Sequence, residues 1–197
     1  MIEAKKVFEA FQDVRRDAIV SVQGTSGKHW GEISTKPRRD ISTAEAMGHS
    51  TPAMFGVALG IPDQKVVHFD TEGALLMNLG VLASIAGKKP KNFVHFLLDN
   101  GCYATTGGQP VPNSENIDYA LIAKGAGYPA TYSFNDLEDL SLHLKEIMQQ
   151  EGPVFVSIKV LPEVENLPIG QREKRKGRRS RLQMIEDFRE ELGISQG

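Results

Sequence analysis

Residues 66–109, VVHFDTEGALLMNLGVLASIAGKKPKNFVHFLLDNGCYATTGGQ, decide the fold of this chain. An apolar run ends in Asp70-Thr71-Glu72-Gly73, a helical segment follows, and a second apolar run ends in Asp99-Asn100 before a loop of small residues. This order predicts a strand, a helix and a second strand parallel to the first. Because the carboxyl ends of parallel strands lie at one edge of a sheet, we expect Glu72 and Asn100 to emerge side by side.

Two oxygen donors at one sheet edge suit a hard cation. Magnesium typically takes one or two protein oxygens and completes its octahedron with water and substrate phosphates. Gly73 permits a tight turn, and the N–H groups that open the next helix can face an anion. Each acidic strand end alone would favour a turn or a helix cap, but the pair at this spacing predicts a site for a magnesium diphosphate.

Composition excludes several classes of protein. The chain has 197 residues, 40% of them hydrophobic and 24% charged, which is ordinary for one soluble domain with at most a small second element. A net charge of −2 argues against an electrostatic nucleic-acid binder. The single cysteine, Cys102, excludes an internal disulfide. We see no signal-peptide core and no apolar run long enough for a membrane, so we expect a cytoplasmic protein.

The first third of the chain should bring a second loop to the same edge. Residues 2–16 have the spacing of an amphipathic helix, and residues 18–22 read as a short strand. The strand delivers Gly24-Thr25-Ser26, whose amides and hydroxyls suit a phosphate, although this is also good turn chemistry. Residues 28–40 are expected to form a polar connection, in which Trp30 packs either within the domain or at a subunit contact.

The remaining segments alternate between helix and strand. We expect Ser50 or Thr51 to cap a helix, one helix from Gly73 to Ala86, and His95 to be a partly buried, hydrogen-bonded histidine. Further elements are expected at residues 93–98 (strand), 101–116 (long loop), 117–127 (helix), 130–134 (strand), 137–148 (helix capped by Asn135) and 153–160 (strand). About six such alternations predict an α/β fold, a doubly wound, mainly parallel sheet with helices on both faces, over residues 1–160.

The tail, residues 161–197, changes character. Residues 172–181, REKRKGRRSR, hold seven basic residues and one acid, and Leu182, Ile185, Phe188 and Leu192 predict a closing amphipathic helix. The basic run is either a solvated charge run or a surface for an anionic substrate or an acidic partner subunit. RNA is a further possible partner of the basic run, but it ranks last because the net charge of the chain is nearly neutral.

At its strand ends the chain resembles the thiamine-diphosphate (ThDP) enzymes. Their motif is Gly-Asp-Gly, a helix, a strand and then Asn-Asn; here Thr71-Glu72-Gly73 and Asp99-Asn100 stand at these places. The resemblance implies ThDP and Mg²⁺ as cofactors, with Glu72, Asn100 and the backbone carbonyl of Cys102 as metal ligands. Glutamate in place of aspartate keeps the charge and adds a methylene.

The resemblance runs from about Asp17 to Val160 and implies further contacts with the cofactor. Those to the diphosphate side would come from Gly24, Thr25, Ser26, Gly73, Ala74, Tyr103 and Thr105. On the thiazolium side, Met47 would lie beneath the bent cofactor beside Gly48, the carbonyl of Glu45 would accept from the 4′-amino group, and His49 would lie near the reacting carbon. Without the neighbouring motifs, Met47 would be a core side chain and His49 a residue at a helix start.

Within these enzymes, Ala46–Ser50, Gly73–Gly80 and Asp99–Gly108 resemble the beta subunit of sulfopyruvate decarboxylase and the corresponding domain of phosphonopyruvate decarboxylase. This implies a lyase, a carboxy-lyase acting on an anionic 2-oxo acid such as 3-sulfopyruvate or phosphonopyruvate. It also implies a heteromer with a pyrimidine-binding alpha subunit that supplies a catalytic glutamate. The alternatives are a ThDP-dependent carboligase or oxidase subunit and a non-catalytic ThDP-binding module. Residues 23–28 complete neither a dinucleotide-binding fingerprint nor a P-loop.

Overall fold

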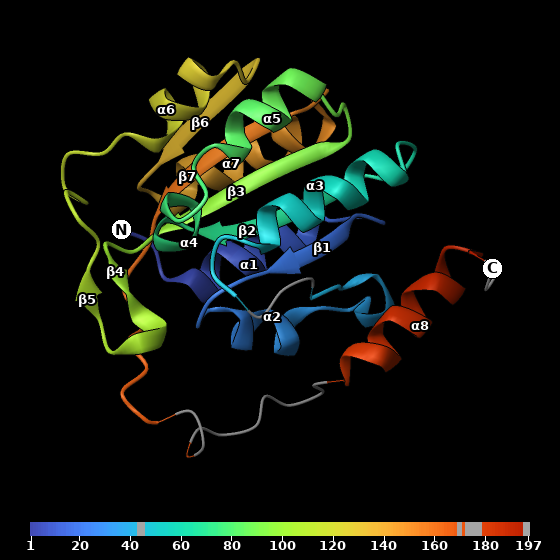
Figure 1. The fold of residues 1–197 in the computed structure, drawn as a ribbon, viewed down its shortest axis with the longest axis horizontal. Helices are drawn as coiled ribbons and strands as arrows, with labels where there is room; N and C mark the ends of the chain where they lie inside the picture. Colours follow the sequence, from blue (N-terminus) through green and yellow to red (C-terminus); the bar gives the residue numbers. More distant parts are fainter. Residues whose placement is uncertain (43–45, 169–170, 172–178, 195–197) are drawn as a thin grey trace.

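The computed structural model describes residues 1–42, 46–168, 171 and 179–194, and its centre is one parallel sheet (Figure 1). The strands of this sheet are β1 (Ile19–Val22), β2 (Val66–Thr71), β3 (Phe93–Asp99), β6 (Ala130–Phe134) and β7 (Val154–Lys159). They lie in the order β1-β2-β3-β7-β6, and every neighbouring pair is parallel. All five strands were expected from the sequence within one or two residues of these bounds.

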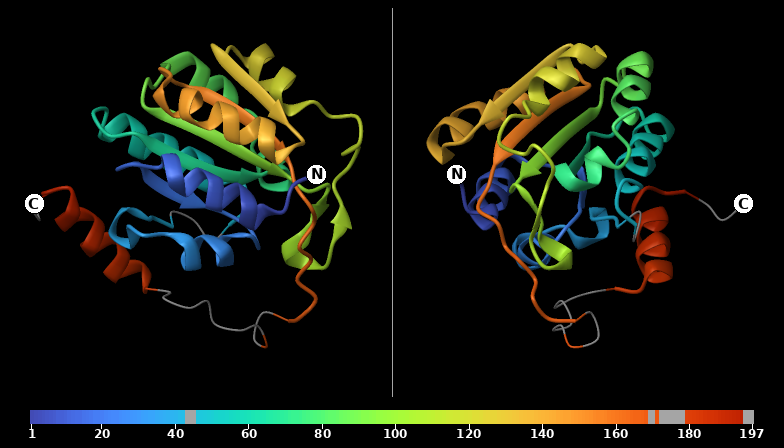
Figure 2. Two further views of the ribbon diagram at one scale, coloured as in Figure 1. Left: turned by 180° about the vertical axis from the view of Figure 1, so that it is seen from behind. Right: turned by 60° about the vertical axis from the view of Figure 1, so that its left-hand side comes forward.

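Helices cover both faces of the sheet (Figures 1 and 2). They are α1 (Ala4–Val14), α2 (Gly27–Ile33), α3 (Ser50–Gly60), α4 (Glu72–Leu76), α5 (Val81–Lys88), α6 (Tyr119–Ala126), α7 (Leu137–Gln149) and α8 (Arg181–Glu191). Residues of α1, α2 and α7 pack on one face, and residues of α3, α5, α6 and α8 pack on the other. β7 lies between β3 and β6, so the chain moves back towards the centre of the sheet after β6. Because crossovers between parallel strands are right-handed, α7 then lies on the opposite face from α6. The predicted doubly wound α/β fold is confirmed.

The face beneath α1 and α7 is an apolar core rich in aromatic rings. Phe69 of β2 stacks on Phe96 of β3 with ring centroids 4.7 Å apart. Phe8 and Phe11 of α1 meet Phe69 edge-on at 5.1 and 5.0 Å. Offset and edge-to-face pairs of this kind add to the stabilisation from burial.

The structure corrects the expectation for residues 28–40. Gly27–Ile33 is helical, and η1 (Pro37–Arg39), a 3-10 turn, follows it. Trp30 is 4% exposed in the apolar core, so packing within the domain is the alternative that holds. The sequence did not predict this helix because α2 presents one large apolar side chain to the core and mostly polar residues to solvent, so its apolar periodicity is weak.

Two expected helix starts were also wrong. His49 is the N-cap of α3, so Ser50 and Thr51 are already helical, and the Thr51 hydroxyl donates to the carboxylate of Asp70. Asp136, not Asn135, caps α7 and accepts from the N–H groups of Glu138 and Asp139 at 3.0 and 3.1 Å.

The helix expected after Gly73 is in fact two helices, α4 and α5. Residues 77–80 between them form turns, and the Asn78 side chain there donates to the carbonyl of Gly48 at 3.0 Å. Gly80, a weak helix former, precedes the first residue of α5. The break therefore ties the start of the second helix to the loop that precedes α3.

The long loop after β3 contains a small hairpin. β4 (Cys102–Tyr103) pairs antiparallel with β5 (Gln109–Pro110), and the 3-10 turn η2 (Ala104–Thr106) lies between them. This hairpin lies at the end of the molecule where β1, β2 and β3 finish (Figure 1).

The closing helix forms as α8, but its apolar stripe is shifted from the expected one. Met184 and Phe188 are each 8% exposed, whereas Leu182 is 76% and Ile185 is 37% exposed. Arg179, which precedes α8, forms an ion pair at 2.6 Å with Asp187 of this helix. Most of the basic run, residues 172–178, lies outside the described residues. No described helix combines the length and the apolar character that crossing a bilayer requires.

Candidate functional site

A cleft lies at the carboxyl ends of β1, β2 and β3, where the sequence predicted a site. Its walls come from the loop after β1, the turn into α4, the start of the hairpin and the segment before α3. The lining residues are Gly24, Thr25, Met47, Thr71, Gly73, Asn100, Cys102, Tyr103, Ala104, Thr105 and Thr106. Loops that are far apart in the sequence therefore meet at one sheet edge, as parallel topology requires.

Glu72, the first residue of α4, lies buried next to this cleft. Its side chain is inaccessible to solvent, and neither carboxylate oxygen reaches a partner among the described residues. Burial raises the pKa of Glu72 to about 7; the charge of Asp99 adds to the increase, and nearby backbone N–H groups, including that of Asn100, oppose it. Glu72 and Asn100 thus lie together as expected. A buried carboxylate of this kind needs a cation or a proton.

Asn100 and Cys102 supply two further oxygens beside Glu72. The Oδ1 atom of Asn100 accepts from the backbone N–H of Cys102 at 2.9 Å, which leaves it a second lone pair. In the hairpin, the N–H of Val111 donates to the carbonyl of Gly101 at 3.0 Å, so Cys102 and Pro110 form the next, non-hydrogen-bonded pair and the carbonyl of Cys102 points away from β5. Among the described residues no group of three or more His, Cys, Asp or Glu side chains could hold a metal. The predicted ligands are instead one carboxylate, one amide and one carbonyl.

At two glycines of the cleft, side chains of neighbouring segments lie very close to the backbone. Gly24 has a φ of +86°, and a Cβ atom there would lie 2.8 Å from the Cγ2 atom of Thr71. A Cβ atom on Gly73 would lie 2.6 Å from the Tyr103 ring. Only glycine fits at either place. The two positions keep bare backbone at the cleft, where N–H groups can face an anion.

The segment before α3 forms another wall. Met47 lines the cleft, and Gly48, at a φ of +79°, packs against Met77 and Asn78. His49 is exposed, precedes α3 and does not line the cleft. Glu45, whose carbonyl was expected to contact the cofactor, lies outside the described residues.

The other predicted contacts divide into two groups. Gly24, Thr25, Gly73, Tyr103 and Thr105 line the cleft, whereas Ser26 and Ala74 are buried behind it. Thr71 and Ala104 also line the cleft but had been given no role from the sequence. Their signal was available, since Ala104 lies between two residues predicted to contact the diphosphate and Thr71 directly precedes the predicted metal ligand Glu72.

A buried polar layer supports the site from below. Asp70 accepts from the Thr51 hydroxyl and lies 3.6 Å from the Nε2 atom of His95. Burial works to raise the pKa of Asp70, but His95, His68 and Thr51 outweigh it, and the pKa is lowered overall. Burial lowers the pKa of His68 to about 4, so that ring is neutral.

The expectation for His95 was wrong. It is fully buried rather than partly buried, and neither ring nitrogen reaches hydrogen-bond geometry with a described residue. Its Nε2 atom lies 3.6 Å from the Asp70 carboxylate. His95 lies in the middle of a central strand, beside His68 on β2, where helices cover both faces and exclude water.

Asp99 holds a second buried charge near Glu72. It is 1% exposed, and its Oδ2 atom forms an ion pair at 2.6 Å with Lys159 of the adjacent strand β7. In strand register these two residues are direct partners. The lysine therefore balances the carboxylate that stands where the ThDP motif has its first asparagine.

Comparison with known proteins agrees with this geometry. Residues 24–158 match the family described as thiamine pyrophosphate enzyme, C-terminal TPP binding domain. The chain belongs to this family. The match covers the cleft-lining residues, β2, β3, β6 and all but the last residue of β7, and it begins just after β1.

Named relatives cover this chain to different extents. It is 37% identical over 152 residues to a phosphonopyruvate decarboxylase of Streptomyces viridochromogenes, covering 76% of this chain and 37% of that protein. It is 31% identical over 170 residues to the sulfopyruvate decarboxylase subunit beta of Methanothermobacter thermautotrophicus, covering 86% of this chain and 88% of that one. The chain thus spans about a third of the first relative and most of the second.

A solved structure supports the fold. A protein described as a thiamin diphosphate-dependent enzyme from Mycobacterium smegmatis superposes with a TM-score of 0.71 and 26% sequence identity. The superposition covers 82% of this chain and 32% of that one. The domain described above therefore corresponds to one part of a larger enzyme of this class.

Proposed function

We propose that the chain is the diphosphate-binding subunit of a heteromeric, ThDP-dependent 2-oxo acid decarboxylase. The observation that carries the proposal is the buried carboxylate of Glu72, whose oxygens reach hydrogen-bond geometry with none of the described residues and which lies beside a cleft lined by glycines and hydroxyl groups. A magnesium diphosphate would supply the cation that Glu72 needs and the anion that the glycine loops suit. The named relatives, a sulfopyruvate decarboxylase beta subunit and a phosphonopyruvate decarboxylase, support the reaction class.

In this proposal three residues hold the metal and the loops hold the diphosphate. Glu72, the Oδ1 atom of Asn100 and the carbonyl of Cys102 ligate Mg²⁺. The Gly24–Ser26 loop, the turn at Gly73 and the hydroxyl groups near Thr105 face the phosphate oxygens. Cation binding ionises Glu72, because a divalent charge next to the carboxylate favours its charged form far more than burial disfavours it.

ThDP, when bound, supplies the electron sink that loss of carbon dioxide from a 2-oxo acid requires. The chain's own residues position and shield it. Met47 supports the thiazolium side from the cleft wall, and Asn78 fixes the backbone beside Met47 through the carbonyl of Gly48. His49 faces outward at the start of α3, from where it would orient or protonate the reacting substrate.

The site is completed by a partner. We propose a pyrimidine-binding alpha subunit that supplies a catalytic glutamate to the aminopyrimidine ring. Two comparisons support a split enzyme: the chain covers about a third of a relative named as a whole decarboxylase and 88% of one named as a beta subunit. The substrate is an anionic 2-oxo acid such as 3-sulfopyruvate or phosphonopyruvate.

Carbon dioxide release tests this function. The tagged chain, purified with its partner from its own cells, is given ThDP, Mg²⁺ and either 3-sulfopyruvate or phosphonopyruvate. We expect release from one of them that requires both cofactors and the partner, and that Glu72→Gln abolishes. A carboligation product in place of the aldehyde that simple decarboxylation releases would indicate a carboligase instead. Bound ThDP without turnover of either acid would indicate a non-catalytic module.

A further inference from the structure

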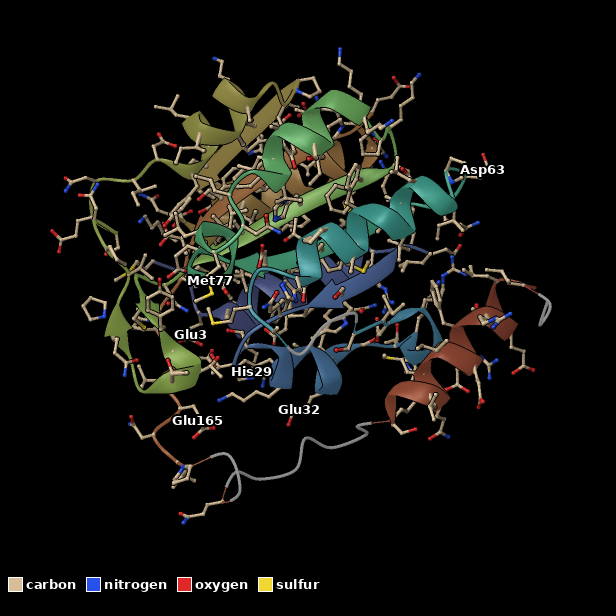
Figure 3. All side chains as sticks on the ribbon, in the orientation of Figure 1. Glu3, His29, Glu32, Asp63, Met77 and Glu165 are labelled. Atoms are coloured by element: carbon tan, nitrogen blue, oxygen red, sulfur yellow. The ribbon has the colours of Figure 1, made fainter. Side chains whose placement is uncertain are left out.

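The segment after β7, residues 161–168, runs between the two loop walls of the cleft; we call it the strap. Its start is fixed, because the N–H of Val160 donates to the carbonyl of Asp99 at 2.9 Å and that of Leu161 to the carbonyl of Ile2 at 2.9 Å. From there the strap passes the hairpin and emerges below it in Figure 1. In Figure 3, Glu165 of the strap and His29 of α2 lie at this same end of the molecule.

Glu163 of the strap holds the wall made by the loop after β1. Its two carboxylate oxygens lie 3.0 and 2.8 Å from the Nε2 atom of His29, and Lys28 lies 3.3 Å from one of them. The side chains of Glu163 and His29 are only 23% and 20% exposed. The backbone N–H of His29 in turn donates to the carbonyl of Ser26 at 3.0 Å. Glu163 is therefore linked through one helical turn to the Gly24–Ser26 loop.

The next two residues of the strap hold the opposite wall. The N–H of Glu165 donates to the carbonyl of Ala104 at 2.8 Å, within η2, whose three residues all line the cleft. Val164 packs closely against Gly108, since a Cβ atom on Gly108 would lie 3.0 Å from a methyl group of Val164. Three consecutive strap residues thus contact both loops that face the diphosphate.

We propose that Glu163 is a positioning residue that fixes the spacing between the Gly24–Ser26 loop and the Ala104–Thr106 turn, and so preorganises the diphosphate cleft. This rests on the proposed function for its consequence but not for its geometry. A paired carboxylate that is mostly withdrawn from solvent orders its partners better than an exposed ion pair does. Preorganised loops bind a ligand without an ordering cost.

Hydrogen exchange on the full chain without cofactor tests the geometry. In Glu163→Gln we expect backbone amides of residues 24–29 and 103–108 to exchange about tenfold faster than in the wild type, with β2 and β3 unchanged. The matched control is Glu32→Gln. Glu32 is an exposed acid on α2, the helix that carries His29 (Figure 3), and its substitution should leave exchange at the wild-type rate. Unchanged exchange at both walls, or faster exchange throughout the strands, would overturn the proposal.

ThDP binding to the chain with its partner, in Mg²⁺, tests the consequence. Glu163→Gln should raise the ThDP Kd about tenfold, as the loss of one charge-assisted contact would. His29→Gln should do the same, and the double variant should be no weaker than either single variant. Additive losses or an unchanged Kd would contradict the role of the pair. A wild type that does not bind ThDP would refute the proposed function, while the exchange comparison would still decide the geometry.

Discussion

Both faces of the central strands β2 and β3 are buried, but only one of them includes ionisable side chains of these strands. Beneath α1 and α7, the side chains of β2 and β3 are Val67, Phe69, Val94, Phe96 and Leu98, all hydrocarbon. The alternate positions on the other face include His68, Asp70, His95 and Asp99, each at most 1% exposed. Because side chains alternate along a strand, one pair of strands carries an apolar core and a polar layer.

This difference separates stability from chemistry. Burying hydrocarbon is favourable, whereas burying a charge or an unpaired polar group costs free energy. The polar face accepts this cost just below the cleft, where no described residue forms a hydrogen bond with the Glu72 carboxylate and Asp70 supports the start of α3. We expect substitutions on the apolar face to change folding and those on the polar face to change binding and pH response.

The largest effect on stability should come from the apolar face. Phe69→Ala removes a ring that contacts Phe8, Phe11 and Phe96 and should lower the free energy of unfolding by about 3–5 kcal/mol. Urea denaturation measures this loss. A change below about 1 kcal/mol would show that this face does not carry the stability of the fold.

On the polar face, Glu72→Gln should stabilise the cofactor-free chain. The pKa of Glu72 is about 7 in the folded chain against the ordinary value of 4.5, so between these pH values the folded state holds more protons than the unfolded state. Stability therefore falls as pH rises through this window, by roughly 3 kcal/mol in all. Denaturation should find the variant more stable by about this amount near pH 8 and equal to the wild type near pH 4. A constant difference at every pH would contradict the assignment.

His68 should give the opposite pH response. Its pKa of about 4 lies below the ordinary value of 6.5, so as pH falls through this window the unfolded chain takes up a proton that the folded chain does not. Lowering the pH from about 7 to about 5 should cost roughly 2 kcal/mol through this residue. His68→Leu should remove that part of the acid sensitivity. An unaltered pH profile would mean that the pKa of the ring is the same in the folded and the unfolded chain.

The smallest effect concerns the backbone at the cleft. Gly24→Ala should cost about 1–2 kcal/mol, because its φ of +86° suits glycine and the new methyl would meet Thr71. Gly125→Ala in α6 is the matched control; nothing lies within 4 Å of its Cβ position, and it should stabilise the chain slightly. Thermal unfolding separates the two. Equal shifts would show that the close approach at Gly24 carries no strain.

Sequence patterns predicted the parts of the structure that depend on local periodicity and on topology. The five strands follow from apolar runs, and the meeting of Glu72 with Asn100 follows from parallel strand ends. What they missed depends on long-range partners. The Thr51 hydroxyl donates to the carboxylate of Asp70, which is distant in sequence. The contact between His29 and Glu163 joins residues 134 positions apart and leaves no local signal.

The most direct test of the account is the cofactor dependence of unfolding in the wild type and in Glu72→Gln. ThDP with Mg²⁺, at about 100 times its Kd, should stabilise the wild type by about 2.7 kcal/mol. ThDP without a divalent cation should not. Glu72→Gln should gain nothing from either, although it is the more stable chain near neutral pH without cofactor. Equal stabilisation of both chains by ThDP and Mg²⁺ would contradict the central claim that the buried carboxylate is the cation ligand.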